Sequence, residues 1–122
     1  MSKIICNSIE FIFTHEIRVM VPGKVTLMPG GEWKILKVTE KPVYRSETSR
    51  ADPGPVKEET ATAVTRYSPD AILKQYSNFP VVLRLKTDDA VFFVGSQQYP
   101  VLTEVSCDMV NDNYSFSCRS EP

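Results

Sequence analysis

The chain has 122 residues, of which 42% are hydrophobic and 24% charged, as is typical of a single globular domain. Its formal net charge of -1 gives no basic field that could hold a phosphate backbone, so nucleic acid is expected to be at most an incidental partner. No apolar run approaches the roughly 20 residues that cross a bilayer, and Met1-Ser2-Lys3 leads into a strand-like segment, so we expect no membrane partner and a cytoplasmic protein.

The first third of the chain, residues 1–40, predicts a β-meander. Ile9, Phe11 and Phe13 alternate with other residues and should share one strand face. The same spacing places three more side chains on one face of the next strand: Ile17, Val19 and Val21. Val25 and Leu27 continue the pattern beyond a Pro22-Gly23 turn, and a fourth strand is expected from Trp33 to Val38.

Residues 41–66 change composition abruptly and predict a long polar loop. The segment contains Pro42, Pro53, Gly54 and Pro55, many charges of both signs, and almost no large apolar residue. A structureless loop of this length is uncommon inside a compact domain and is usually functional or disordered. Fixing its backbone would cost on the order of 25 to 50 kcal/mol, so we expect it to become ordered against a neighbouring subunit.

Eight residues of this loop are the candidate contacts with a neighbour. They are Val43, Tyr44, Arg45, Arg50, Val56, Lys57, Val64 and Arg66. The basic members could meet acidic patches on another subunit, or they could simply solvate the loop.

A short helix is expected within residues 67–79. Ser68 is placed as its N-cap with Pro69 at the first helical position, and Asn78 with Pro80 supplies the stop. The apolar stripe of Ile72, Leu73 and Tyr76 should cover the core of the sheet.

The last part, residues 80–119, predicts a second β-meander. Strands are expected over 81–87, 91–94 and 101–109, with a turn at Asp88-Asp89. A two-residue loop at Asn111-Asp112 would set Met109 opposite Tyr114. The same register would set two further pairs on that face, Cys107 with Phe116 and Val105 with Cys118.

Residues that could carry chemistry are few. Cys6, Cys107 and Cys118 have no metal-ligand spacing and are expected to be buried free thiols, as in a reducing compartment. The single histidine, His15, is expected in an exposed turn. We therefore predict no catalytic residue, no cofactor and no metal, and a non-enzymatic protein.

The complete pattern predicts a mainly β fold, a small antiparallel barrel or sandwich of seven to eight strands with one short helix. The last third of the chain resembles small phage and prophage proteins of Bacteroides-like gut bacteria. The resemblance rests on three stretches: Leu83-Arg84-Leu85-Lys86-Thr87-Asp88-Asp89-Ala90, then Val94-Gly95-Ser96-Gln97-Gln98-Tyr99-Pro100, and Tyr114-Ser115-Phe116-Ser117-Cys118.

In layout the chain is also similar to the head-to-tail connector, or stopper, proteins of tailed phages. These resemblances imply a structural virion protein, a connector or tail component, that forms a homo-oligomeric ring through its long loop and contacts neighbouring virion proteins. The alternative is a small intracellular β-rich adaptor or ligand-binding module.

Overall fold

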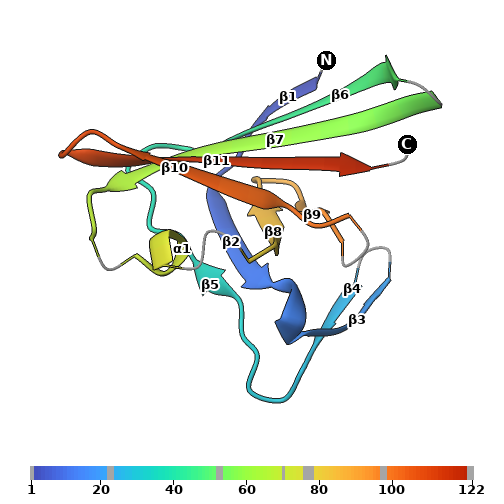
Figure 1. Ribbon diagram of the computed structural model, residues 1–122, viewed down its shortest axis with the longest axis horizontal. Helices are drawn as coiled ribbons and strands as arrows, with labels where there is room; N and C mark the ends of the chain where they lie inside the picture. Colours follow the sequence, from blue (N-terminus) through green and yellow to red (C-terminus); the bar gives the residue numbers. More distant parts are fainter. Residues whose placement is uncertain are drawn as a thin grey trace.

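The computed structural model describes residues 2–21, 24–51, 54–69, 71–75, 79–96 and 99–120 (Figure 1). The positions named above that lie outside these ranges are Met1, the Pro22-Gly23 turn, Pro53, Tyr76, Asn78, Gln97 and Gln98. In the described ranges the chain is mainly β and all strand pairs are antiparallel, which confirms the predicted fold class. These ranges contain eleven strands, more than the seven to eight expected.

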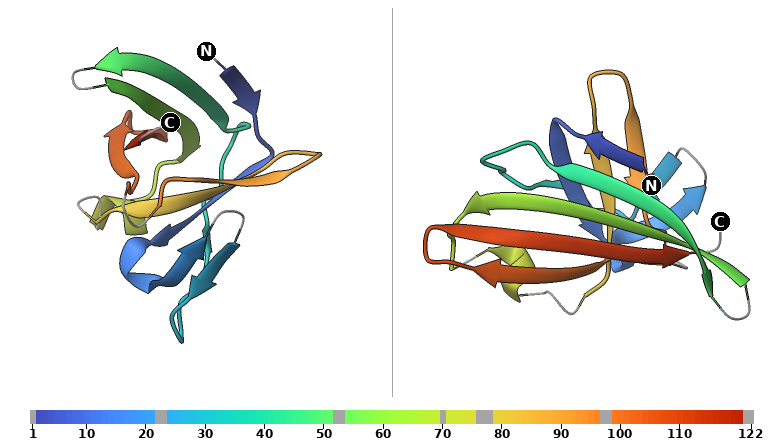
Figure 2. Two further views of the ribbon diagram at one scale, coloured as in Figure 1. Left: turned by 90° about the vertical axis from the view of Figure 1, so that its right-hand side faces the viewer. Right: turned by 90° about the horizontal axis from the view of Figure 1, so that it is seen from above.

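The largest sheet has five strands in the order β1-β6-β7-β11-β10. The bounds are Ser2–Ile5 for β1, Val43–Ala51 for β6, Gly54–Arg66 for β7, Leu102–Cys107 for β10 and Asn111–Ser120 for β11. Figure 2 shows this sheet curling over the rest of the molecule.

A four-stranded sheet and a two-stranded ribbon complete the β structure. The four-stranded sheet has the order β5-β2-β8-β9, with bounds Lys34–Ile35, Ser8–Phe13, Val81–Lys86 and Val91–Val94. The ribbon pairs β3, Ile17–Val21, with β4, Lys24–Leu27. A 3-10 turn, η1, spans Thr14–Glu16, and the helix α1 spans Ile72–Gln75.

The two larger sheets enclose the main core and are joined at two corners. At one corner the chain passes from β1 into β2, and the Cys6 N–H donates to the Pro42 carbonyl at 2.8 Å. At the other corner Val81 and Val101 exchange backbone hydrogen bonds of 3.0 and 2.8 Å. The core between the sheets is formed by apolar side chains of both, including Phe11, Leu83, Tyr44, Ala61 and Phe116.

The predicted strand faces hold in β2 and fail in β3. Ile9, Phe11 and Phe13 are all buried, as predicted. Ile17 is buried, but Val19 and Val21 are about half exposed, because the register shifts between Ile17 and Val19. Such a bulge reverses the faces of the residues that follow it.

The strand expected from Trp33 to Val38 is reduced to the two residues of β5. Ile35 is exposed, whereas Leu36 and Val38 pack against the main core and Trp33 packs against a smaller cluster with Ile12 and Ile17.

The prediction that residues 41–66 form a loop is wrong. The segment folds as the long hairpin β6–β7, in which Val43 lies opposite Thr62 and Ala51 lies opposite Gly54. In β7 the small, buried side chains of Ala61 and Ala63 alternate with the β-branched side chains of Thr62 and Val64. This pattern suits a strand that is packed on one face. The hairpin therefore has a shape of its own, and the entropic argument that only a neighbour could order it does not hold.

The helix begins later than predicted, and Ser68 is not its N-cap. The helix begins at Ile72, and the Ser68 N–H instead donates to Oδ2 of Asp112 at 3.1 Å. Leu73 is buried in the main core, so the predicted covering role of the helix holds at this position.

The C-terminal strands occur where they were predicted, but the register of the last hairpin is wrong by four residues. Val105 lies opposite Tyr114, and Cys107 lies opposite Asp112. The turn is at Met109-Val110, where Met109 takes a left-handed φ of 72°. An L side chain is unfavourable in this conformation, which explains why a turn at Asn111-Asp112 was expected instead. The shift leaves Cys107 exposed, contrary to prediction, whereas Cys6 and Cys118 are buried; all three are free thiols.

Candidate assembly surface

The base of the β6–β7 hairpin is held by a buried polar contact. The Tyr44 hydroxyl donates to Oε2 of Glu59 at 2.6 Å, and Lys57 Nζ lies 3.9 Å from the other carboxylate oxygen. Burial, and then the hydrogen bond to Glu59, raise the pKa of Tyr44. Tyr44 therefore stays a neutral hydrogen-bond donor to Glu59.

In the part of the chain that the structure describes, the outer half of the hairpin extends beyond the neighbouring strands. From Ser2 onward β1 pairs with β6 as far as Ser46, and up to Ser120 β11 pairs with β7 as far as Lys57. Residues 47–51 and 54–56 are paired with each other alone in the described part of the chain. Figure 1 shows this two-stranded ribbon extending past the end of β11. We call residues 47–56 the arm.

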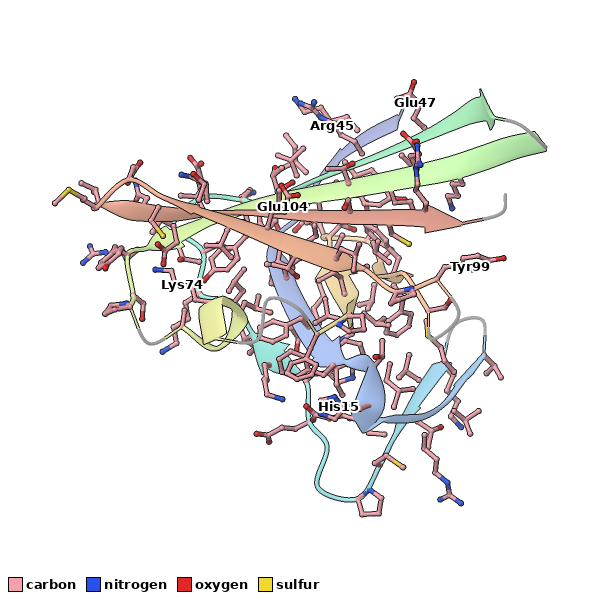
Figure 3. All side chains as sticks on the ribbon, in the orientation of Figure 1. His15, Arg45, Glu47, Lys74, Tyr99 and Glu104 are labelled. Carbon is pink, nitrogen blue, oxygen red and sulfur yellow. The ribbon has the colours of Figure 1, made fainter. Side chains whose placement is uncertain are left out.

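Like charges face each other where the arm begins. Glu47 lies directly opposite Glu58, an arrangement that is destabilising in an antiparallel pair. Arg119 offsets part of this charge, because its Nη2 lies 2.6 Å from Oε1 of Glu58. Arg45 and Glu47 project from the outer side of the sheet (Figure 3), and both border a shallow hollow of about 200 Å³.

The candidate contact residues are distributed unevenly over this hairpin. Arg45 and Arg66 are exposed, and Val43, Lys57 and Val64 are partly exposed. Tyr44 is buried in the core, so it is not available as a contact with a neighbour, contrary to the expectation. Arg50 and Val56 belong to the arm, and only their backbone is described.

A second group of polar residues, which sequence reasoning missed, lies between α1 and the β10–β11 hairpin. Asp112 is fully buried, and its Oδ1 lies 2.8 Å from Nζ of Lys74. Burial alone would raise the pKa of Asp112, but hydrogen bonds from Lys74 and from the Ser68 N–H outweigh it, so the pKa is lowered. Asp112 was placed in a turn, where a carboxylate is common, so the sequence held no signal of this ion pair.

An open pocket of about 500 Å³ lies beside this ion pair. Lys74 borders it together with four residues of β10: Thr103, Glu104, Val105 and Cys107. The Thr103 hydroxyl is buried and has no hydrogen-bond partner in the described part of the chain. Glu104 on β10 and Lys74 on α1, both labelled in Figure 3, line this pocket.

The other sequence candidates take structural roles. His15 is exposed in η1 and stacks on Phe13 with a centroid distance of 5.6 Å. The Thr87 hydroxyl accepts hydrogen bonds from the N–H groups of Asp89 and Ala90, as expected of a turn. Among the described residues, no three His, Cys, Asp or Glu side chains are grouped as metal ligands. None of the described helices is long and apolar enough to span a bilayer.

Comparison of the chain with protein-family models, with curated proteins and with solved structures finds no match.

Proposed function

We propose that this chain is a non-enzymatic structural subunit that assembles into a homo-oligomeric ring through its arm. Its proposed setting is a phage-like particle, as a head-to-tail connector, a stopper or a tail component, made in the bacterial cytoplasm and located in the virion. The proposal of ring assembly rests on the arm, and the proposal of a phage-like particle rests on the sequence resemblance.

The physical reason is that an isolated two-stranded ribbon is marginally stable in water. The arm has no third strand in the described part of the chain, and it begins at the Glu47–Glu58 pair of like charges. A neighbouring subunit would add backbone partners and cationic groups at this place. The free energy of the contact would come from completing an existing strand pair, and the ordering cost would be smaller than for a disordered loop.

The test shortens the arm without changing its turn. Deleting Ser49, Arg50, Pro55 and Val56 removes two opposed pairs and keeps the alternation of the ladder, because Thr48 is then joined to Ala51 and Gly54 to Lys57. Met109→Gly, at the turn of the other long hairpin, is the matched control. It leaves the arm intact and removes an L side chain from a left-handed conformation.

Light scattering after size-exclusion chromatography gives the mass of each variant. The native chain and Met109→Gly are expected to form the same oligomer, whereas the short-arm variant is expected to be monomeric and to fail to enter particles. An oligomer of unchanged mass from the short-arm variant would refute the proposed function.

A ligand-binding module is the second candidate, and one pocket favours it. The pocket measures about 500 Å³ and lies where residues 36–39 pass the end of β7. Leu36, Val38, Tyr67 and Tyr114 contribute a largely apolar lining. A native chain that stays monomeric at all concentrations and is stabilised by a small apolar compound would favour this function over assembly.

A further inference from the structure

The alternation of hydrogen bonds shows which backbone groups of β10 are open. The Asp108 N–H donates to the Asn111 carbonyl at 3.1 Å, so these two residues form a hydrogen-bonded pair with β11. Such pairs alternate along an antiparallel ladder, so Ser106, Glu104 and Leu102 also bond to β11. The backbone groups of Thr103, Val105 and Cys107 therefore point away from β11.

Val101 confirms this assignment, because its N–H and carbonyl both bond to Val81, on the side away from β11. Beyond Val101, no strand in the described part of the chain pairs with this side of β10. Leu102–Cys107 contains no proline and only one charged residue, Glu104, so the sequence of β10 gives this edge little protection against strand addition. The pocket beside Lys74 borders this edge.

The same reasoning identifies the open groups of the arm. The Tyr67 N–H donates to the Val110 carbonyl, so the odd-numbered residues of β7 bond towards β11 and the even-numbered ones towards β6. In β6 the odd-numbered residues then bond to β7, and the even-numbered ones face β1. Thr48 and Arg50 lie beyond the end of the β1 pairing, so their backbone groups have no partner strand in the described ranges.

The other side of the arm is a poor donor. Pro55 has no N–H, and its position places the missing donor on the outer edge of β7. The β6 side is therefore the side of the arm that can accept a new strand.

We propose that residues 47–51 of β6 from a second copy pair with the open edge of β10, beside α1. This inference rests on the proposed function and names the surface that receives the arm. β6 and β10 run in opposite directions within one sheet, so a neighbour in the same orientation would add antiparallel, as in the rest of the sheet. Repeating one such head-to-tail contact closes a ring when the rotation between copies allows it.

Disulfide trapping tests the pairing directly, because Cys107 already lies on the receiving edge. Thr48→Cys and Arg50→Cys place a thiol on the arm, at residues whose backbone faces the neighbour. Ser49→Cys is the matched control, since the Ser49 backbone pairs with Val56 of its own chain. Within one subunit β6 and β10 are three strand spacings apart, about 14 Å, so a bond to Cys107 must join two copies.

Oxidation of the assembled protein with diamide is expected to give covalent multimers from Thr48→Cys or Arg50→Cys. Ser49→Cys should give none, and adding Cys107→Ser should abolish those formed. Arm-dependent assembly without any bond from position 48 or 50 to Cys107 would overturn the docking site and leave the proposed function standing. A native chain that does not assemble through its arm would overturn both the docking site and the proposed function.

If the cysteine variants assemble too poorly for disulfide trapping, Val105→Pro tests the docking on β10 instead. The N–H group that this substitution removes points to the open edge, so no hydrogen bond to β11 is lost. Thermal unfolding verifies that the variant is folded. We expect assembly at least about tenfold weaker than in Val105→Ala, since proline removes a donor from the edge. Equal assembly of the two variants would overturn the proposed docking.

Discussion

Tyr44 donates its phenolic hydrogen to Glu59 across the base of the β6–β7 hairpin, with an O···O distance of 2.6 Å. Both residues are buried, and a buried carboxylate is stabilised by a hydrogen-bond donor. Tyr44→Phe is expected to lower the free energy of unfolding by about 1–3 kcal/mol. Chemical denaturation measures this change, and Tyr67→Phe, at a half-exposed hydroxyl, is the control. Equal stability of the two variants would contradict the role of the contact.

The Glu10 carboxylate, in the four-stranded sheet, is expected to make the stability of the protein depend on pH. Arg84 donates to both carboxylate oxygens, at 3.1 and 2.6 Å, and Lys86 Nζ lies 3.1 Å from one of them. The hydrogen bonds from Arg84 lower the pKa of Glu10 from its usual value of 4.5. A depressed pKa in the folded state stabilises the protein above the pKa of the unfolded state, and this contribution is lost as the pH falls through the folded value.

We therefore expect the native chain to lose stability as the pH falls below about 4.5, with a shallower dependence in Glu10→Gln. Glu10→Gln is also expected to be less stable at neutral pH, since Arg84 and Lys86 lose their anionic partner. Thermal unfolding over a pH series measures both effects. Parallel pH profiles for the two proteins would show that Glu10 does not carry the acid response.

The Lys74–Asp112 pair gives a prediction about the order of stabilities. Removing one partner of a buried ion pair leaves an uncompensated charge, whereas replacing both partners with apolar residues is often nearly neutral. Lys74→Met should thus be less stable than the double variant Lys74→Met/Asp112→Leu. Melting temperatures of the single and double variants test this order, and a double variant that is the least stable of all would contradict it.

The three cysteines are expected to differ in reactivity. Burial raises the pKa of Cys118 to about 11 and also raises the pKa of Cys6, so both thiols stay protonated at neutral pH. Cys107 is exposed. Ellman's reagent should therefore modify one thiol rapidly in the folded monomer and three after denaturation, and Cys107→Ser should lose the rapid reaction. Rapid modification of two thiols in the folded native chain would contradict the burial of Cys6 or Cys118.

The core strands could be predicted from sequence because their apolar spacing matches their burial. Ile9, Phe11 and Phe13 show period-2 alternation, and the structure buries all three. The bulge after Ile17 could not be predicted, because the alternation of Ile17, Val19 and Val21 is the same as in a regular strand. The shift is visible only in the pairing with β4.

The hairpin at 43–66 was missed for a different reason. Its strands carry charges and prolines that resemble a loop in composition, but Pro55 lies on the outer edge of β7, where no N–H is needed. The register of the last hairpin was missed because Met109 takes a conformation that sequence rules assign to Asn or Gly. Neither the open edge of β10 nor the Lys74–Asp112 pair has a local sequence signal, because both depend on contacts between distant segments.

The arm is the central element of this account, and sedimentation velocity on the native and short-arm chains tests it most directly. Over a wide range of concentrations, the native chain is expected to shift from monomer to a single larger species of defined mass, while the short-arm variant stays monomeric with an unchanged melting temperature. A native chain that remains monomeric throughout, or a short-arm variant that forms the same species, would contradict assembly through the arm.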